Sequence, residues 1–96
     1  MKKIDLIIDS KKYKDVYIAE TFFERLKGLM FVSKEKSFNL LIKNCNSIHT
    51  CFMKFNIDVY CLDKNYKIIK FYKELNPFRF IITSNKVKYI LEIPSK

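Results

Sequence analysis

Short apolar runs that alternate with polar residues follow one another along almost the whole chain. In residues 2–8, for example, Ile4, Leu6 and Ile8 would share one face of a strand, and Asp5 would lie on the other. Polar segments that favour turns separate this run from the ones that follow. We therefore predict seven or eight strands, with candidates at residues 2–8, 13–19, 38–43, 48–54, 57–62, 67–75, 78–83 and 87–93.

Two neighbouring pairs of these strands are expected to form hairpins. A polar turn at residues 9–12 would join the first two strands. The clearest hairpin joins residues 57–62 to residues 67–75. In its turn we expect Asn65 to adopt the left-handed backbone conformation, which asparagine tolerates better than most residues.

One short helix is predicted after the second strand. Thr21 and Glu24 have the spacing of a capping box, in which each side chain accepts a hydrogen bond from the other residue's backbone amide. Gly28, the only glycine, can adopt a positive φ and end the helix after about two turns. A helix of this length is stable only when its apolar side docks on a sheet. The apolar positions at helical spacing are Phe22, Phe23, Leu26, Leu29 and Met30.

Composition agrees with a β fold of modest size. Nine Phe and six Tyr favour strands, while one Gly and two Pro leave few residues for tight primed turns. A length of 96 residues suffices for one hydrophobic core and not for two. We expect a single domain over residues 1–96.

The chain carries a formal net charge of +9, from 19 Lys and Arg against 10 Asp and Glu. Such a charge attracts nucleic acid or an anionic membrane surface. The lysines are scattered along the chain, however, and we interpret them as a solvated surface. Specific nucleic-acid binding is not favoured, although electrostatic binding to nucleic acid or to a membrane surface stays open as an alternative.

Three cysteines without C-x-x-C spacing favour free thiols in a reducing compartment. Carboxylates at Asp5 and Asp9 interrupt any secretory apolar segment, and no apolar run approaches the ~18 residues of a membrane span. We expect a cytoplasmic protein without a transmembrane segment.

The least generic chemistry lies in residues 47–58. If residues 48–54 form a strand, then His49, Cys51 and Met53 share one face. With Cys61 on a neighbouring strand, such a set would suit Cu(I), or Zn without Met53. The same alternation is typical of a buried strand in which Cys and Met act as apolar filling, and we favour this interpretation and expect no cofactor.

His49 and Cys51 would also form a nucleophile and base pair in a thiol-dependent enzyme or sensor. No orienting carboxylate stands at a characteristic spacing, although Asp58 could fold back toward them. This chemistry is an alternative, not our main expectation.

Three motifs in order resemble the bacterial and archaeal family known as "domain of unknown function 192". They are Arg25-Leu-Lys-Gly-Leu-Met30, His49-Thr-Cys-Phe-Met-Lys54 followed by Ile57-Asp58, and Tyr89-Ile-Leu-Glu-Ile-Pro94. The resemblance implies a mainly β fold, a small antiparallel sandwich or distorted barrel of jelly-roll character with one short helix. The family has no established biochemical role.

Recurrent polar positions of that family define the candidate binding residues. The resemblance implies a ligand site, and the cations Arg25 and Lys54 would suit an anionic small molecule or glycan. The structural alternative is that Asp58 and Glu92 tie strand ends to Arg25 and to backbone amides, and for Arg25 we favour this pairing. The candidate residues are Arg25, His49, Met53, Lys54, Asp58 and Glu92.

The function expected from these observations is a non-enzymatic binding or accessory module for an unknown small molecule or protein partner. The alternatives are the metal- or thiol-dependent enzyme or sensor that uses His49 and Cys51, and electrostatic binding through the lysines. The ligand and the oligomeric state do not follow from the sequence.

Overall fold

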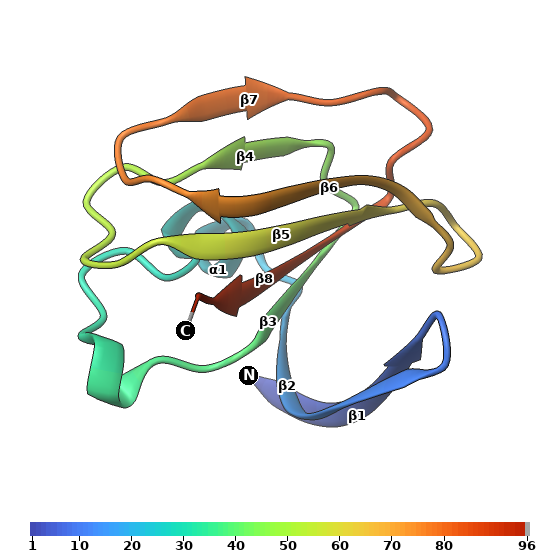
Figure 1. The fold of residues 1–96 in the computed structure, drawn as a ribbon, viewed down its shortest axis with the longest axis horizontal. Helices are drawn as coiled ribbons and strands as arrows, with labels where there is room; N and C mark the ends of the chain where they lie inside the picture. The colour runs from blue at the N-terminus through green and yellow to red at the C-terminus, as the bar shows by residue number, and fades with distance from the viewer. Residues whose placement is uncertain (96) are drawn as a thin grey trace.

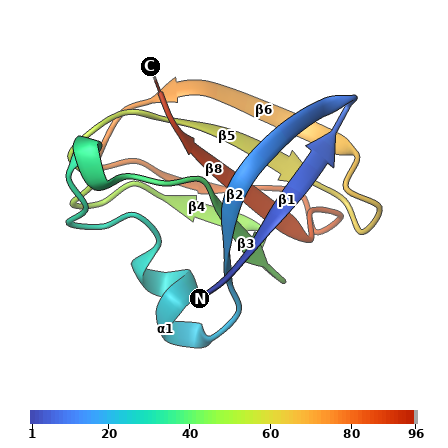
Figure 2. The same cartoon turned by 90° about the horizontal axis from the view of Figure 1, so that it is seen from below.

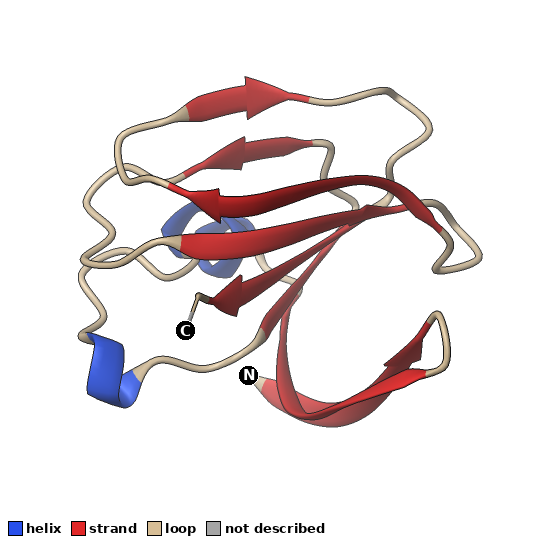
Figure 3. Ribbon diagram, in the orientation of Figure 1, coloured by secondary structure: helices blue, strands red, loops and turns tan. Residues whose placement is uncertain are grey.

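Eight strands form in the computed structural model, which describes residues 1–95 (Figures 1 and 3). The mainly β class with one short α-helix is confirmed, and the sheets are not closed, so the sandwich alternative holds and not the barrel. The elements in chain order are β1 (Lys2–Ile8), β2 (Lys11–Ala19), α1 (Phe22–Lys27), a 3-10 turn η1 (Lys34–Lys36), β3 (Leu40–Lys43), β4 (Ser47–His49), β5 (Ile57–Leu62), β6 (Ile68–Leu75), β7 (Phe80–Ile82) and β8 (Tyr89–Pro94).

Six strands form one sheet in the order β1-β2-β3-β8-β5-β6, and β4 pairs with β7 in a second sheet. The pairs are antiparallel except β2 with β3, which are parallel because the chain passes through α1 between them. Figure 1 shows β4 and β7 above β5 and β6, with the β1–β2 hairpin curling away below. Figure 2 shows that hairpin, which forms one end of the large sheet, crossing in front of β8, with α1 projecting from one side of the strands.

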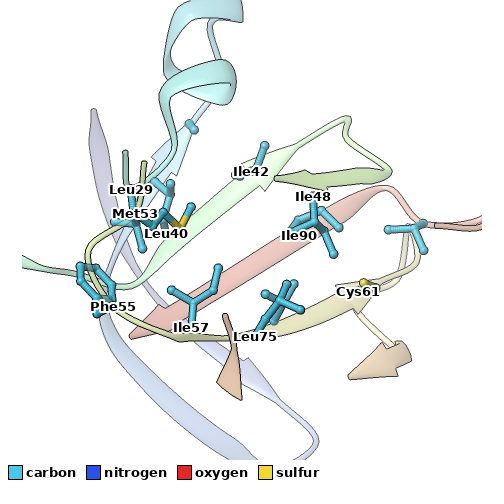
Figure 4. Packing of buried hydrophobic residues seen from close by; sticks show 13 residues of the cluster. Leu29, Leu40, Ile42, Ile48, Met53, Phe55, Ile57, Cys61, Leu75 and Ile90 are labelled. Atoms are coloured by element: carbon cyan, nitrogen blue, oxygen red, sulfur yellow. The ribbon is translucent and has the colours of Figure 1, made fainter. Parts of the chain in front are cut away.

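The central strands of the large sheet, β3, β5 and β8, contribute buried residues to both faces, whereas the edge strands β1 and β6 are mostly exposed. Along β5, Ile57, Val59 and Cys61 enter one apolar cluster, whereas Leu62 and the partly buried Tyr60 belong to a second. The first cluster lies between the large sheet, the small sheet and the end of α1; Figure 4 shows its residues. The second is covered by the β1–β2 hairpin, which contributes three of its buried residues, Ile8, Tyr13 and Val16.

The capping box of α1 forms as predicted. The Glu24 amide donates to Thr21 Oγ1 at 3.1 Å, and the Thr21 amide donates to Glu24 Oε1 at 3.1 Å. The Glu24 carboxylate accepts from the amides of Thr21 and Glu20, and these two hydrogen bonds lower its pKa. Gly28 ends the helix with φ of 51°, as expected.

The expectation that α1 docks its own apolar side is wrong. None of the six residues Phe22–Lys27 is buried, and Phe22 and Phe23 are 70% and 78% exposed. The helix is instead held by Leu29, which follows it and is fully buried in the first apolar cluster. Among residues 1–95, no helix has the length and apolar character needed to cross a membrane.

Two local predictions fail in the turns. The strand predicted at residues 48–54 ends at His49, because a turn follows at Cys51 and Phe52, where Phe52 adopts φ of 60°. In the β5–β6 turn the left-handed residue is Tyr66 and not Asn65. The Asp63 carboxylate accepts hydrogen bonds from the amides of Asn65 and Lys67 and so closes the turn one residue later.

Because the chain has one glycine, several residues other than glycine adopt a positive φ. Three of these residues are phenylalanines, Phe31, Phe52 and Phe78, with φ of 63°, 60° and 63°. This conformation costs about 1–2 kcal/mol for a residue with a Cβ. It persists only where the surrounding structure imposes it.

Thr50, which is fully buried, supplies much of that constraint. Its Oγ1 donates to the Asn76 carbonyl at 2.7 Å and accepts from the Arg79 amide at 2.8 Å. Its backbone exchanges further bonds, with its amide donating to the Arg79 carbonyl and its carbonyl accepting from the Phe78 amide. The turn after β4 and the loop between β6 and β7 are thereby held together by one residue.

We predict that Thr50→Val destabilises the protein by about 1–3 kcal/mol, because it leaves the buried partners of the hydroxyl unpaired. Thr50→Ser keeps the hydroxyl, and it should lower the free energy of unfolding by only about 1 kcal/mol because the buried methyl group is lost. Denaturant unfolding measures both, and amide hydrogen exchange at Phe78 and Arg79 should accelerate in the Val variant alone. Equal exchange rates in the two variants would show that the hydroxyl does not hold this loop.

Candidate functional site

A pocket of about 310 Å³ lies between α1, the segment that leads into β4, and β7. On α1, Phe22, Arg25 and Leu26 stand at positions i, i+3 and i+4, which share one face of a helix. Phe80 pairs with His49 across the small sheet, so β7 brings an aromatic wall to the opposite side. The lining residues are Phe22, Arg25, Leu26, Cys45, Ser47, His49 and Phe80.

Arg25 is the cation of this pocket. Its Nη1 donates to the Asn44 carbonyl at 3.3 Å, and its buried Nε has no hydrogen-bond partner within residues 1–95. The ion pairs of the described residues join Lys3 to Asp15, Lys12 to Asp5 and Lys43 to Glu20. The expected pairing of Arg25 with a carboxylate is therefore wrong, and the guanidinium keeps donor capacity for an anion.

His49 reaches the pocket from the end of β4. Its Nε2 lies 2.6 Å from the carbonyl oxygen of Leu26, in the last turn of α1. A carbonyl oxygen only accepts, so Nε2 donates the hydrogen. The imidazole thereby satisfies a carbonyl that a helix end leaves without an intrahelical partner, and it fixes α1 against β4.

The shared strand face of His49, Cys51 and Met53 does not exist. The strand ends at His49, Cys51 lies in the turn, and Met53 returns into the core at 4% exposure. Figure 4 shows Met53 beside Leu29 and Leu40. The argument for a metal or nucleophile site on this face is therefore wrong, and no cluster of three His, Cys, Asp or Glu side chains suited to a metal occurs within residues 1–95.

Cys61 is a core residue of β5. It is fully buried in the first apolar cluster. Burial, followed by the proximity of Cys45, raises the pKa of its thiol to about 11. The uncharged thiol acts as apolar filling, as expected for a cysteine that is not reactive.

Glu92 lies beneath the end of α1. It is 2% exposed, and its Oε1 has no hydrogen-bond partner among the described residues. A Cβ on Gly28 would stand 3.4 Å from this oxygen and 3.9 Å from Met53 Cε. Burial raises the pKa of Glu92 to about 8, so the carboxyl is mostly protonated at neutral pH. The backbone at Gly28 lies directly over this carboxyl.

The remaining two candidate residues lie away from this pocket. Asp58 accepts hydrogen bonds from the Glu74 amide and Ser95 Oγ, each at 2.8 Å, and it borders a separate cavity of about 390 Å³. Asp58 thus binds a backbone amide, as its structural alternative proposed, but not Arg25. Lys54 is exposed and lines a hollow beside Phe31.

Of the six candidate residues, only Arg25 and His49 share a pocket. Met53 and Glu92 are buried, and both lie close to Gly28. The aromatic walls were missed by sequence reasoning. Phe22 could have been found from its helical spacing to Arg25, whereas no spacing relates Phe80 to that helix because the small sheet alone brings it there.

The sequence model of the DUF192 family, described as "Uncharacterized ACR", matches residues 5–96. The UPF0127 protein of Thermococcus sibiricus is 36% identical over 84 residues, which cover 82% of this chain and 54% of that protein. The UPF0127 protein of Pyrococcus horikoshii is 33% identical over 84 residues, covering 83% and 72%. The chain spans about half the length of the Thermococcus relative.

Two solved structures share the fold. A protein of unknown function from Novosphingobium aromaticivorans superposes with a TM-score of 0.76 at 14% identity, over 95% of this chain and 71% of the other. A candidate transcription regulator from Sinorhizobium meliloti gives 0.77 at 19% identity, over 95% and 78%. At these identities the likeness concerns the fold alone.

We predict that Glu92 makes the protein less stable as pH rises. The unfolded chain releases this proton near the ordinary pKa of 4.5, while the folded state holds it up to about 8. The contribution of Glu92 to the free energy of unfolding is therefore fully present below about pH 4.5. It is lost as pH rises through about 8, by on the order of a few kcal/mol.

Denaturant unfolding at about pH 5 and about pH 9 measures this loss. Glu92→Gln should remove most of the difference and be the more stable variant at the higher pH. Glu35→Gln, at an exposed carboxylate of η1, is the control and should keep the wild-type difference. An unchanged pH dependence in Glu92→Gln would contradict the assignment.

Proposed function

This chain belongs to the DUF192 family of uncharacterised proteins, and we propose that it is a non-enzymatic binding module for a small molecule that joins an anionic group to an apolar one. The observation that carries the proposal is the pocket of Arg25. In it, a guanidinium whose buried Nε has no hydrogen-bond partner among residues 1–95 stands among the side chains of Phe22, Leu26 and Phe80.

The chemistry of a fitting ligand follows from this lining. A carboxylate can accept two parallel hydrogen bonds from a guanidinium, and such charge-assisted pairs are strong where water is partly excluded. The flanking phenyl and leucyl groups would bury the apolar part of the same molecule. A volume of about 310 Å³ is at the small end of ligand pockets, so the ligand would be about the size of an arylacetate.

Two contacts support binding over covalent chemistry at this pocket. The Nε2 hydrogen of His49 is engaged by the Leu26 carbonyl. Cys45 Sγ donates to the Ser47 carbonyl at 3.1 Å, which requires the protonated thiol and not the nucleophilic thiolate. Both side chains act here in holding the walls of the pocket.

We also propose that the protein works in a reducing compartment, the cytoplasm. The support is that Cys45, Cys51 and Cys61 are all free thiols in the described structure. Secreted proteins of this size commonly use their cysteines in disulfides.

Phenylacetate is the probe for this proposal. In a titration followed by NMR of the labelled protein, we expect the backbone amides of Leu26, His49 and Phe80 to shift. Acetate has the carboxylate without the phenyl ring, and benzyl alcohol has the ring without the carboxylate. Both should bind more weakly than phenylacetate. Binding should weaken at least about tenfold in Arg25→Gln, since it loses a charge-assisted hydrogen bond.

Arg79→Gln is the matched control, because Arg79 is the other arginine of the chain and is exposed outside the pocket. It should bind phenylacetate as the wild type does. If the two variants lose affinity equally, or if the shifts map to the cavity around Asp58, the pocket of Arg25 is not the ligand site.

A further inference from the structure

Three exposed phenylalanines from three separate loops meet at one place on the surface. Phe31, Phe52 and Phe78 are 61%, 53% and 68% exposed. The rings of Phe31 and Phe52 stack at 5.3 Å between centroids, and Phe78 meets Phe52 edge to face at 5.7 Å. None of the three lines the pocket of Arg25, so this aromatic cluster is independent of the proposed ligand site.

The backbone holds all three residues in a conformation that phenylalanine rarely adopts. Each has φ close to 60°, the left-handed region that asparagine and glycine prefer. The Phe31 amide donates to the Phe52 carbonyl at 3.0 Å, and the Phe78 amide donates to the Thr50 carbonyl at 3.0 Å. Strain imposed by a hydrogen-bonded scaffold is characteristic of functional surfaces, and here it presents apolar rings to solvent.

Cations border the aromatic cluster. Lys36 and Lys54 line a hollow with Phe31, and Arg79 follows Phe78 directly. Glu35 is the one carboxylate of the neighbouring turn η1. The whole chain carries a formal charge of +9, so a partner for this surface is expected to be anionic.

We propose that the aromatic cluster of Phe31, Phe52 and Phe78, with Lys36, Lys54 and Arg79 around it, docks the protein on an anionic lipid bilayer. The phenyl rings would enter the boundary between headgroups and acyl chains, and the cations would contact the headgroup phosphates. Each cation near such a surface strengthens binding about fivefold.

The geometry fits other partners less well. Nucleobases stack on open ring faces, but Phe31 and Phe52 cover part of each other's faces. A second copy of this chain would bring another charge of +9 to the contact. A bilayer requires only apolar rings beside cations.

The test uses the full chain and sedimentation with vesicles of phosphatidylcholine, alone or mixed with phosphatidylserine. We expect binding to the mixed vesicles to be at least about tenfold tighter than to the neutral ones, and to weaken as salt rises. Lys36→Gln combined with Lys54→Gln should weaken binding on the order of twentyfold.

The decisive variant replaces all three phenylalanines by asparagine, which adopts positive φ readily and so preserves the backbone. It should lose at least about tenfold in binding to the mixed vesicles. The matched control removes exposed apolar area elsewhere, by Ile7→Thr on β1 and Ile69→Thr on β6, and should bind as the wild type does.

A second measurement reports insertion directly. The chain has no tryptophan, so Phe52→Trp introduces a single tryptophan, which can be excited selectively beside the six tyrosines. Its emission should be quenched by brominated phosphatidylcholine in the mixed vesicles. Emission that stays unquenched in bound protein would show adsorption by charge alone and would overturn the proposal.

Four further results would also overturn it. The first two are the absence of vesicle binding and binding that the asparagine substitutions leave unchanged. Another is binding of a single-stranded oligonucleotide, lost in the asparagine variant, by a protein that ignores vesicles. The last is a dimer in light scattering that becomes a monomer in the asparagine variant, since the cluster would then be an interface between two copies.

Discussion

The hydrogen bonds of one buried residue, Thr50, set the geometry of both surfaces that are candidates for function. Through its hydroxyl and its backbone, Thr50 binds the loop between β6 and β7 at Asn76, Phe78 and Arg79. It thereby ends β4 at His49 and reverses the chain, so that Met53 enters the core while Phe52 stays outside. A buried polar group without a hydrogen-bond partner lowers the stability of the fold. Any other course of the chain at this point would therefore have to provide partners for the same hydroxyl, amide and carbonyl groups.

The second constraint is the way α1 is held without burying any of its own residues. Leu29 anchors the chain just after the helix, and His49 binds the Leu26 carbonyl. Gly28 ends the helix at positive φ, directly over the buried carboxyl of Glu92. The outer residues of the helix are therefore free to line a pocket, and burial keeps the carboxyl below them mainly in its neutral form at neutral pH.

The candidate site could be predicted from the sequence only in part. Arg25 and His49, which stand in two of the sequence motifs, line the same pocket. The helical spacing of Phe22, Arg25 and Leu26 predicts the wall that α1 gives to it. The interpretation of His49, Cys51 and Met53 as one strand face is wrong because alternation assumes an uninterrupted strand, and it cannot reveal a turn that distant residues impose. The left-handed phenylalanines were not anticipated for the same reason, since local preference argues against them.

The sequence by itself determined the elements. Alternation located seven of the eight strands to within two residues, but it placed the end of β4 five residues too late. The Thr21 and Glu24 pair located the start of the helix, because strand faces and capping depend on neighbours a few positions apart. The tertiary structure alone decided which of these elements meet. It set the parallel β2–β3 pair, the burial of Glu92, the wall that Phe80 gives to the pocket of Arg25, and the cluster of Phe31, Phe52 and Phe78. These contacts join residues far apart in the chain, and packing and hydrogen bonding across the whole fold set them against local preference.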